Sequence, residues 1–339
     1  MHHTKLIIPT ILAGVLSWTP TGILADPGET WLSYADAQDP PPGEATRSSG
    51  TAASETTATT SEWQKPLPMS FSISYTLVSD YVFRGINFSE YAREGRERLN
   101  HQMATSLSFD LAPLWGGKPG QCGEIGFDTW FEWYAAQQKL NPTTGENIQE
   151  IDYTLWYLYH VEPIATDVKV GWIMYVYPNV RGVGNDDRTH EWFISLAHND
   201  AWLWRGLGYQ GEAGILNPTV TWYHDMHISG GDWIEVGISH PFELARNLTF
   251  TPSYVLGIDS GWYGPFVQDD RDTRIALMTY GIDLTYDLTE LLQLPPWAGS
   301  ITISGFLNFT DLMDQIEHYR PIVGTRDELY GGMKLAWSW

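Results

Sequence analysis

From Met69 onward, apolar residues recur at every second position in runs of about ten residues, with turn residues between the runs. In FSISYTL (71–77) and ITISGFLNF (301–309), large apolar residues occupy nearly every second position, with serine, threonine or asparagine between them. Successive side chains of a β-strand point to opposite faces, so each run predicts a strand with one apolar and one polar face. Alternating runs of about ten residues separated by turn residues are typical of strands that cross a lipid bilayer as a barrel.

The pattern predicts an all-β fold, a transmembrane antiparallel β-barrel of about twelve strands. The strands are expected near 70–84, 101–112, 123–136, 150–162, 166–177, 189–199, 214–225, 232–243, 248–260, 275–286, 299–309 and 329–339. The register within 189–225 is open. Residues 201–214 leave room for a further short element, and Leu288–Leu294 for one helical turn.

Composition separates this fold from its alternatives. Aromatic residues make up 14% of the chain, with 17 Trp and 18 Tyr, yet the mean hydropathy is −0.24. Since no run of 18 apolar residues follows the start, a helical membrane protein is excluded. Tryptophan and tyrosine near strand ends predict interfacial belts. A secreted soluble β-sandwich is the alternative fold.

The chain divides into three segments. Residues 1–25 resemble a signal peptide, with Lys5 before an apolar core and Ala25 as a small residue for cleavage. An N-terminal anchor helix is the alternative, although the apolar run is short for one. Residues 26–68 are rich in Pro, Ser, Thr, Ala and Glu, which predicts a disordered periplasmic tether. Residues 69–339 form the predicted barrel.

The net charge of −22 argues against nucleic acid as a partner, because phosphate binding requires clustered Lys and Arg. An acidic protein suits a surface or channel that attracts cations. The single cysteine, Cys122, cannot form an internal disulfide. No motif indicates a cofactor.

The stretch SDYVFRGINFSE (79–90) poses a particular question. If the first strand continues to residue 84, Asp80, Val82 and Arg84 share one face, and Tyr81 and Phe83 share the other. A charge facing lipid at mid-depth would cost several kcal/mol, so Asp80 and Arg84 are expected to point into the lumen.

Further lumen-lining candidates are acidic or aromatic residues opposite apolar rows. They are Asp128, Glu132, Asp152, Asp283, Trp130 and Trp156, whereas the facing of Glu235 is ambiguous. Rings of carboxylates favour cations. Two interpretations of the charged residues stay open: a lining that tunes permeation, or an interior network of hydrogen bonds and ion pairs that stiffens the wall. For Trp130 and Trp156 the alternatives are a stacking track for a sugar or hydrophobic solute and simple filling of the lumen.

The run HDMH places His224 and His227 at a predicted rim. These two histidines are weak candidates for a surface metal site or for a rim hydrolase. No second acidic pair can be matched to them from the sequence, and no catalytic residue is predicted.

Three stretches resemble the TorF-type porin family of outer-membrane proteins. The first is SDYVFRG, in which Ser79, Asp80, Tyr81, Arg84 and Gly85 match an SDY-x-x-RG motif at the start of the barrel. The others are similar to central and closing strands: Asn217–His227 with Asp232–Leu244, and YGGMKLAWSW at 330–339. The resemblance implies a barrel in the bacterial outer membrane.

Together these features predict a porin-like outer-membrane channel for passive diffusion of small solutes, with a preference for cations. The expected partners are outer-membrane lipid, small solutes and the barrel-assembly machinery, which would read the apolar C-terminal strand. A closed structural or adhesive barrel that acts through its extracellular loops is the main alternative, and a rim-located hydrolase is the third.

Overall fold

The computed structural model describes residues 68–87, 99–118, 120–134, 148–178, 188–211, 214–264, 271–313 and 327–339. Within these residues, no helix is both long and apolar enough to span a membrane. The segments predicted as a signal peptide and a tether lie outside them, apart from Pro68.

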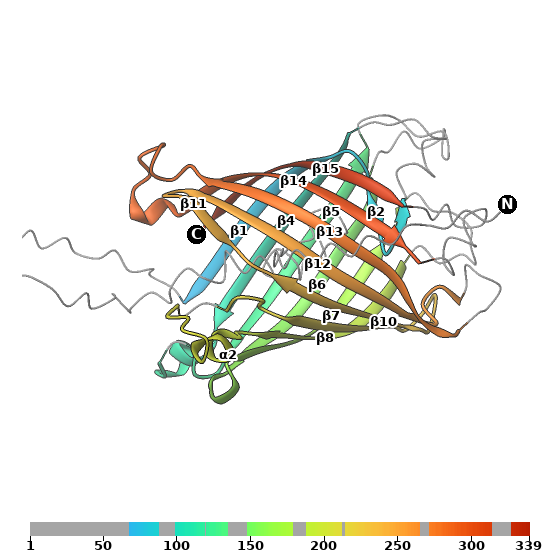
Figure 1. Ribbon diagram of the computed structural model, residues 1–339, viewed down its shortest axis with the longest axis horizontal. Helices are drawn as coiled ribbons and strands as arrows, with labels where there is room; N and C mark the ends of the chain where they lie inside the picture. The colour runs from blue at the N-terminus through green and yellow to red at the C-terminus, as the bar shows by residue number, and fades with distance from the viewer. Residues whose placement is uncertain are drawn as a thin grey trace, which may run out of the picture.

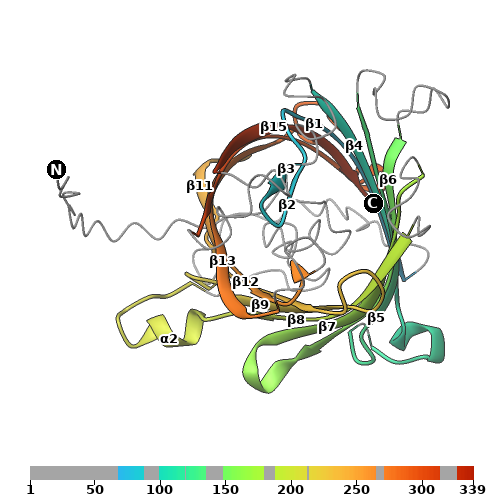
Figure 2. The same cartoon turned by 90° about the vertical axis from the view of Figure 1, so that its right-hand side faces the viewer.

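Twelve long strands pair with their neighbours in an antiparallel ring, shown from the side in Figure 1 and end-on in Figure 2. Their bounds are β1 (Met69–Val78), β4 (Asn100–Asp110), β5 (Glu124–Tyr134), β6 (Ile148–Val161), β7 (Thr166–Val176), β8 (Arg188–His198), β9 (Thr219–Asp225), β10 (Asp232–Ser239), β12 (Leu248–Ser260), β13 (Thr273–Asp287), β14 (Ser300–Leu312) and β15 (Glu328–Ser338). The pairing of β1 with β15 joins the first strand to the last. Closure leaves no free sheet edge, which is a requirement for a sheet surrounded by lipid.

The eighth strand of the barrel wall is interrupted at Pro241 and consists of β10 and a short second strand. β10 pairs with β12 up to Ser239, and the short β11 (Phe242–Ala245) continues the pairing with the same strand. Proline has no N–H to donate to a ladder, which accounts for the interruption.

The barrel has a polar inside and an apolar outside, the reverse of a soluble protein. On β6, Asp152 and Thr154 are fully buried, whereas Leu155, from the other face, is 51% exposed. On β14, Asn308 is fully buried and Phe309 is exposed. This inversion is expected when the outer face is solvated by acyl chains.

The two ends of the barrel differ in their connections. We call the end that holds Met69 and Trp339 the turn end. It also carries the described connections 111–118, 120–123, 162–165, 199–211, 214–218, 240–247 and 288–299, with the short helices η1 (Ala112–Trp115), η2 (Glu162–Ile164), α2 (Ala201–Arg205) and η4 (Pro296–Ala298). The opposite end, where β1 finishes, is called the hairpin end.

The predicted strands are confirmed with small shifts at most boundaries. The short element expected within 201–214 is α2, and the turn expected at 288–294 carries a helical bond from the Leu292 N–H to the Leu288 carbonyl. Three boundaries were wrong. β9 begins at Thr219 rather than at 214, and β1 ends at Val78 rather than at 84. The strand expected over 232–243 ends at Ser239 as β10, and β11 follows after the break at Pro241.

Candidate functional site: the barrel interior

The stretch after β1 is a hairpin folded into the barrel, not the end of a wall strand. β2 (Val82–Phe83) pairs with β3 (Ile86–Asn87), and both lie within the ring of strands in Figure 2. The prediction that Tyr81 and Phe83 face away from Arg84 was therefore wrong, because all three are buried inside. A two-stranded hairpin alternates in the same way as one longer strand, so the alternation does not distinguish the two.

Arg84 and Gly85 form the two-residue turn of this hairpin. Their φ angles are 48° and 80°, and positive φ at both central residues defines the type I′ turn that suits a tight hairpin. A Cβ on residue 85 would lie 2.5 Å from Leu312 Cδ2, in β14. Glycine is thus needed here both for its backbone conformation and for the close approach to the wall.

The side chain of Arg84 reaches across the lumen to β8. Its two terminal nitrogens donate to the two carboxylate oxygens of Glu191 at 2.6 and 2.8 Å. Tyr175 and Trp262 also donate to this carboxylate, at 2.9 and 3.2 Å. The ion pair is almost completely buried, with 1% and 2% of the two side chains exposed. Such a bidentate pair fixes both distance and orientation.

Aromatic rings surround the guanidinium group. Its central carbon lies 4.6–5.4 Å from the ring centroids of Phe83, Tyr223, Trp233 and Trp262. Cation–π attraction strengthens when water is excluded, as it is here. Burial alone would lower the pKa of Arg84, but Glu191 more than offsets this and raises it, so the arginine remains charged.

The rest of the hairpin is fixed to other walls. The Tyr81 hydroxyl donates to Glu150 of β6 at 2.6 Å, and its ring packs on Trp130 of β5. The Tyr263 hydroxyl, beyond β12, donates to the Arg84 carbonyl. Burial raises the pKa of Tyr263, so this phenol stays a donor over the physiological range. The hairpin therefore spans the lumen from β5 and β6 to β12, β13 and β14.

Carboxylates dominate the inner wall. The strand carboxylates that point inward include Glu124, Asp128, Glu132, Glu150, Asp152, Asp167, Glu191, Asp225, Glu235, Asp259, Asp283 and Glu328. The inward basic side chains of the described strands are Lys169, Arg274 and Lys334, and Arg84 adds one from the hairpin. The acidic character predicted for the interior is thus present in the described wall.

The predicted lumen residues lie inside the barrel in distinct settings. Asp128 accepts hydrogen bonds from Ser106 at 2.5 Å and from Trp156 Nε1 at 2.7 Å. Lys169 Nζ lies 4.1 Å from the centroid of the Trp156 ring, next to this group. The two sequence-predicted residues Asp128 and Trp156 thus belong to one contact network on β5 and β6.

The other predicted residues lie elsewhere in the interior. Glu132, Asp152 and Trp130 are fully buried toward the hairpin end, and Asp283 accepts from Thr285 on β13. Asp80 is half-buried and accepts from Asn87 at 3.2 Å within the hairpin. That these side chains line a conducting path remains a prediction.

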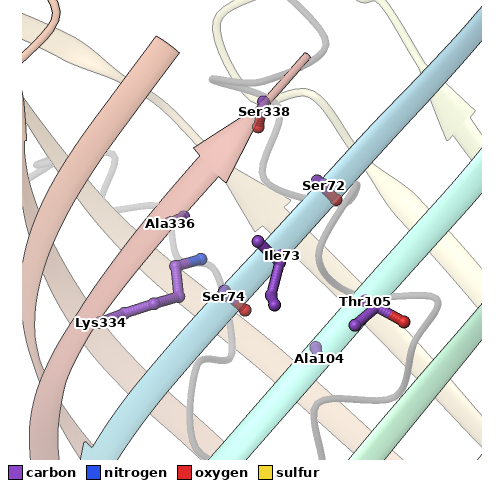
Figure 3. Close-up of a pocket in the computed structure, with 8 residues that line it drawn as sticks. All are labelled: Ser72, Ile73, Ser74, Ala104, Thr105, Lys334, Ala336 and Ser338. Carbon is purple, nitrogen blue, oxygen red and sulfur yellow. The ribbon is translucent and has the colours of Figure 1, made fainter. Parts of the chain in front are cut away.

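Small side chains leave a pocket at the turn end of the interior, drawn in Figure 3. It lies where β15, β1 and β4 meet, and its lining residues are Ser72, Ile73, Ser74, Ala104, Thr105, Lys334, Ala336 and Ser338. Register places Ser74 opposite Ala104 on one side and Ala336 on the other. Three adjacent small residues cannot fill the space between their strands, and the long Lys334 is the one basic group among the lining residues.

The two histidines of HDMH do not converge. His224 points outward and bonds Asp232 at 2.9 Å, whereas His227 stacks on His190 with ring centroids 5.7 Å apart. No cluster of three potential metal ligands occurs among the described residues. The described geometry therefore gives no support to the metal or hydrolase reading of this motif.

Glu191 is the principal residue that sequence reasoning missed. It alternates with Trp192 like any inward polar residue, so nothing local distinguishes it from its neighbours. The hairpin itself had a signal. Two short apolar runs separated by a two-residue unit that ends in glycine are compatible with a type I′ hairpin.

Comparison with known proteins gives distant structural similarity only. No protein-family model matches the chain, and no curated protein matches it. It is similar to the NanC porin, at 9% identity over 78% of this chain and 97% of that one, with a TM-score of 0.41. It is also similar to OprB of Pseudomonas putida, at 8% identity over 80% and 94% with a TM-score of 0.33. The outer-membrane channel DcaP of Acinetobacter baumannii gives 7% over 80% and 96%, with a TM-score of 0.33. Scores this low carry no argument about function, and the description of the fold rests on the strand pairing above.

Proposed function

We propose that this protein is a porin-like channel of the bacterial outer membrane that passes small solutes by diffusion and prefers cations. The observation that carries the proposal is the acidic inner wall within an apolar outer face. A polar interior is consistent with a water-filled path, and an excess of carboxylates favours cations at low to moderate salt. No covalent chemistry forms part of this proposal.

The hairpin is the proposed constriction of the channel. Tyr81 bonds β6 on one side of the lumen, Gly85 lies against Leu312 of β14 on another, and the central ion pair is shielded from water. At twelve strands the interior is narrow, so a crossing hairpin has a large effect on its free cross-section. Diffusion is therefore expected to be slow, and limited by the hairpin end rather than by the turn end.

The hairpin also supports a second candidate function. If it never moves, the barrel is closed and would act through surfaces outside the lumen, as a structural or adhesive protein. The same contacts favour both candidates, because they describe one position of the hairpin. The two functions differ in whether ions pass.

Conductance of the refolded full-length barrel in a planar bilayer separates these candidates. The channel proposal predicts steady steps in the current. In a salt gradient, the reversal potential should shift toward the equilibrium potential of the cation. Silence from a barrel that shows heat-modifiable migration would reject the channel and favour the closed barrel. Anion selectivity would reject the role given to the acidic wall.

A further inference from the structure

Large apolar side chains project from the connections at the turn end. They are Leu114 and Trp115 between β4 and β5, Ile164 between β6 and β7, Trp202, Leu203 and Leu207 between β8 and β9, Leu244 in the short β11 between β10 and β12, and Leu291, Leu292 and Trp297 between β13 and β14. Each is at least half exposed, from 50% for Leu292 to 81% for Leu207. We call this set the apolar skirt.

The skirt surrounds the barrel rather than forming one patch. The twelve wall strands have six junctions at this end. Five are the connections of the skirt, and the sixth is the seam where β15 pairs with β1. At that seam Phe71 packs edge-on against Trp337, with ring centroids 5.8 Å apart. Apolar groups thus occur at every step of the circumference at this end.

Two of these connections also stand outside the wall. In Figure 2 the α2 segment and the teal β4–β5 connection extend sideways from the ring, away from the mouth of the lumen. Their apolar groups continue the exposed outer rows of the strands, such as Tyr157 and Tyr159 of β6. The skirt is therefore an extension of the lipid-facing surface.

Basic side chains accompany the skirt. Lys118 and Arg205 are exposed and lie in two of the same connections, whereas the exposed Arg246, in a third, pairs with Glu290 at 3.1 Å. Long basic side chains next to apolar ones can reach phosphate groups while their stems stay in an apolar region. Tryptophan combines an apolar ring with an N–H donor and suits the same boundary.

From this placement we infer that the apolar skirt inserts into the headgroup and upper acyl region of the leaflet at the turn end, as an interfacial anchor around the barrel. A partner protein would need to encircle the barrel to cover all five connections, whereas lipid already surrounds it. Interfacial segments of this kind bury their apolar face about 5–10 Å into the headgroup and acyl boundary. The inference rests on the proposed membrane location but not on ion conduction.

Depth-dependent quenching tests the anchor in the full chain, refolded into phosphatidylcholine vesicles. The exposed Cys122 is first replaced by serine. A nitrobenzoxadiazole label is then attached in separate variants, Leu207→Cys and Leu291→Cys for the skirt, and Gln210→Cys as an exposed polar control in the same connection as Leu207. Leu155→Cys, on the outer face of β6, reports the barrel's own position in the bilayer.

The skirt labels are expected to be quenched severalfold more strongly by nitroxide near the lipid glycerol than by nitroxide at the chain end or by aqueous iodide. Gln210 is expected to respond mainly to iodide, and Leu155 to the deep nitroxide. If Leu155 responds to deep nitroxide while Leu207 and Leu291 respond to iodide as Gln210 does, the anchor is rejected and the membrane location stands. If Leu155 also fails to respond to lipid nitroxide, the membrane location fails with it.

A second pair of labelled variants tests the inference in a short connection, where a substitution is less disruptive than in the longer ones. Ile164→Cys and Glu162→Cys lie in the three-residue helix η2, one apolar and one acidic, both exposed. The anchor predicts lipid quenching for residue 164 that clearly exceeds that for residue 162. Skirt labels shielded from both lipid nitroxide and iodide would show a protein contact instead and would also overturn the inference.

Discussion

The two halves of the interior are built on different principles. At the hairpin end, a buried ion pair and a cluster of aromatic rings hold a segment of the chain across the lumen. At the turn end, serine and alanine residues on β1, β4 and β15 leave a pocket. The same alternating sequence thus makes both a filled and a less filled section, depending on side-chain size and on what enters from the chain. We expect resistance to permeation to lie in the hairpin half.

Arg84→Ala should have the largest effect on this difference. It leaves Glu191 buried without its cation, and breaking a buried pair costs about 3–5 kcal/mol. The hairpin should leave the lumen, with a severalfold rise in single-channel conductance and a lower urea midpoint. The matched control is Arg274→Ala, which breaks the buried pair with Asp259 in the wall itself. The control should lose stability without the rise in conductance, and equal conductance changes in both variants would contradict the role of the hairpin.

Gly85→Ala should come second. The added methyl group meets Leu312 and also occupies a positive φ, so it should cost more than the roughly 1–2 kcal/mol of left-handed backbone alone. Gly116→Ala isolates the backbone cost, because its φ is 77° and no atom lies within 4 Å of the new methyl group. The difference between the two urea unfolding free energies measures how tightly the hairpin packs. Equal values would show that the hairpin is loosely held.

Charge changes in the turn half should have smaller effects, of opposite sign. Asp128→Asn removes a wall charge but keeps an oxygen to accept from Ser106 or Trp156, so cation preference should fall modestly. Lys334→Gln removes the basic group of the pocket, so cation preference should rise. Reversal potentials in a potassium chloride gradient check both variants. Shifts in the same direction would contradict the assignment of selectivity to this section.

The barrel was predictable from the sequence because strand alternation is a local property. Each inward or outward position follows from counting by two, which placed Asp128 and Trp156 inside. The hairpin was not predicted, because SDYVFRGIN continues the same alternation after β1 ends at Val78. Only the turn geometry at Arg84 and Gly85 distinguishes a fold back from a continued strand.

Contacts across the lumen were beyond the reach of sequence reasoning for a different reason. Arg84 and Glu191 are separated by 107 positions, and their pairing depends on the curvature of the closed ring. The sequence around either residue does not predict which residue it pairs with. The same holds for Tyr81 and Glu150, which meet because the hairpin enters the lumen beside β6.

The most direct test of the central claim compares the full-length barrel with a variant in which Val82–Asn87 is replaced by a short Gly-Ser connection. Both are refolded, checked for heat-modifiable migration and measured as single channels in the same salt gradient. We predict small cation-selective steps for the full-length protein and severalfold larger steps, still cation-selective, for the variant. Steps of the same size in both proteins, or silence from the folded variant, would contradict the claim that the hairpin limits a conducting lumen.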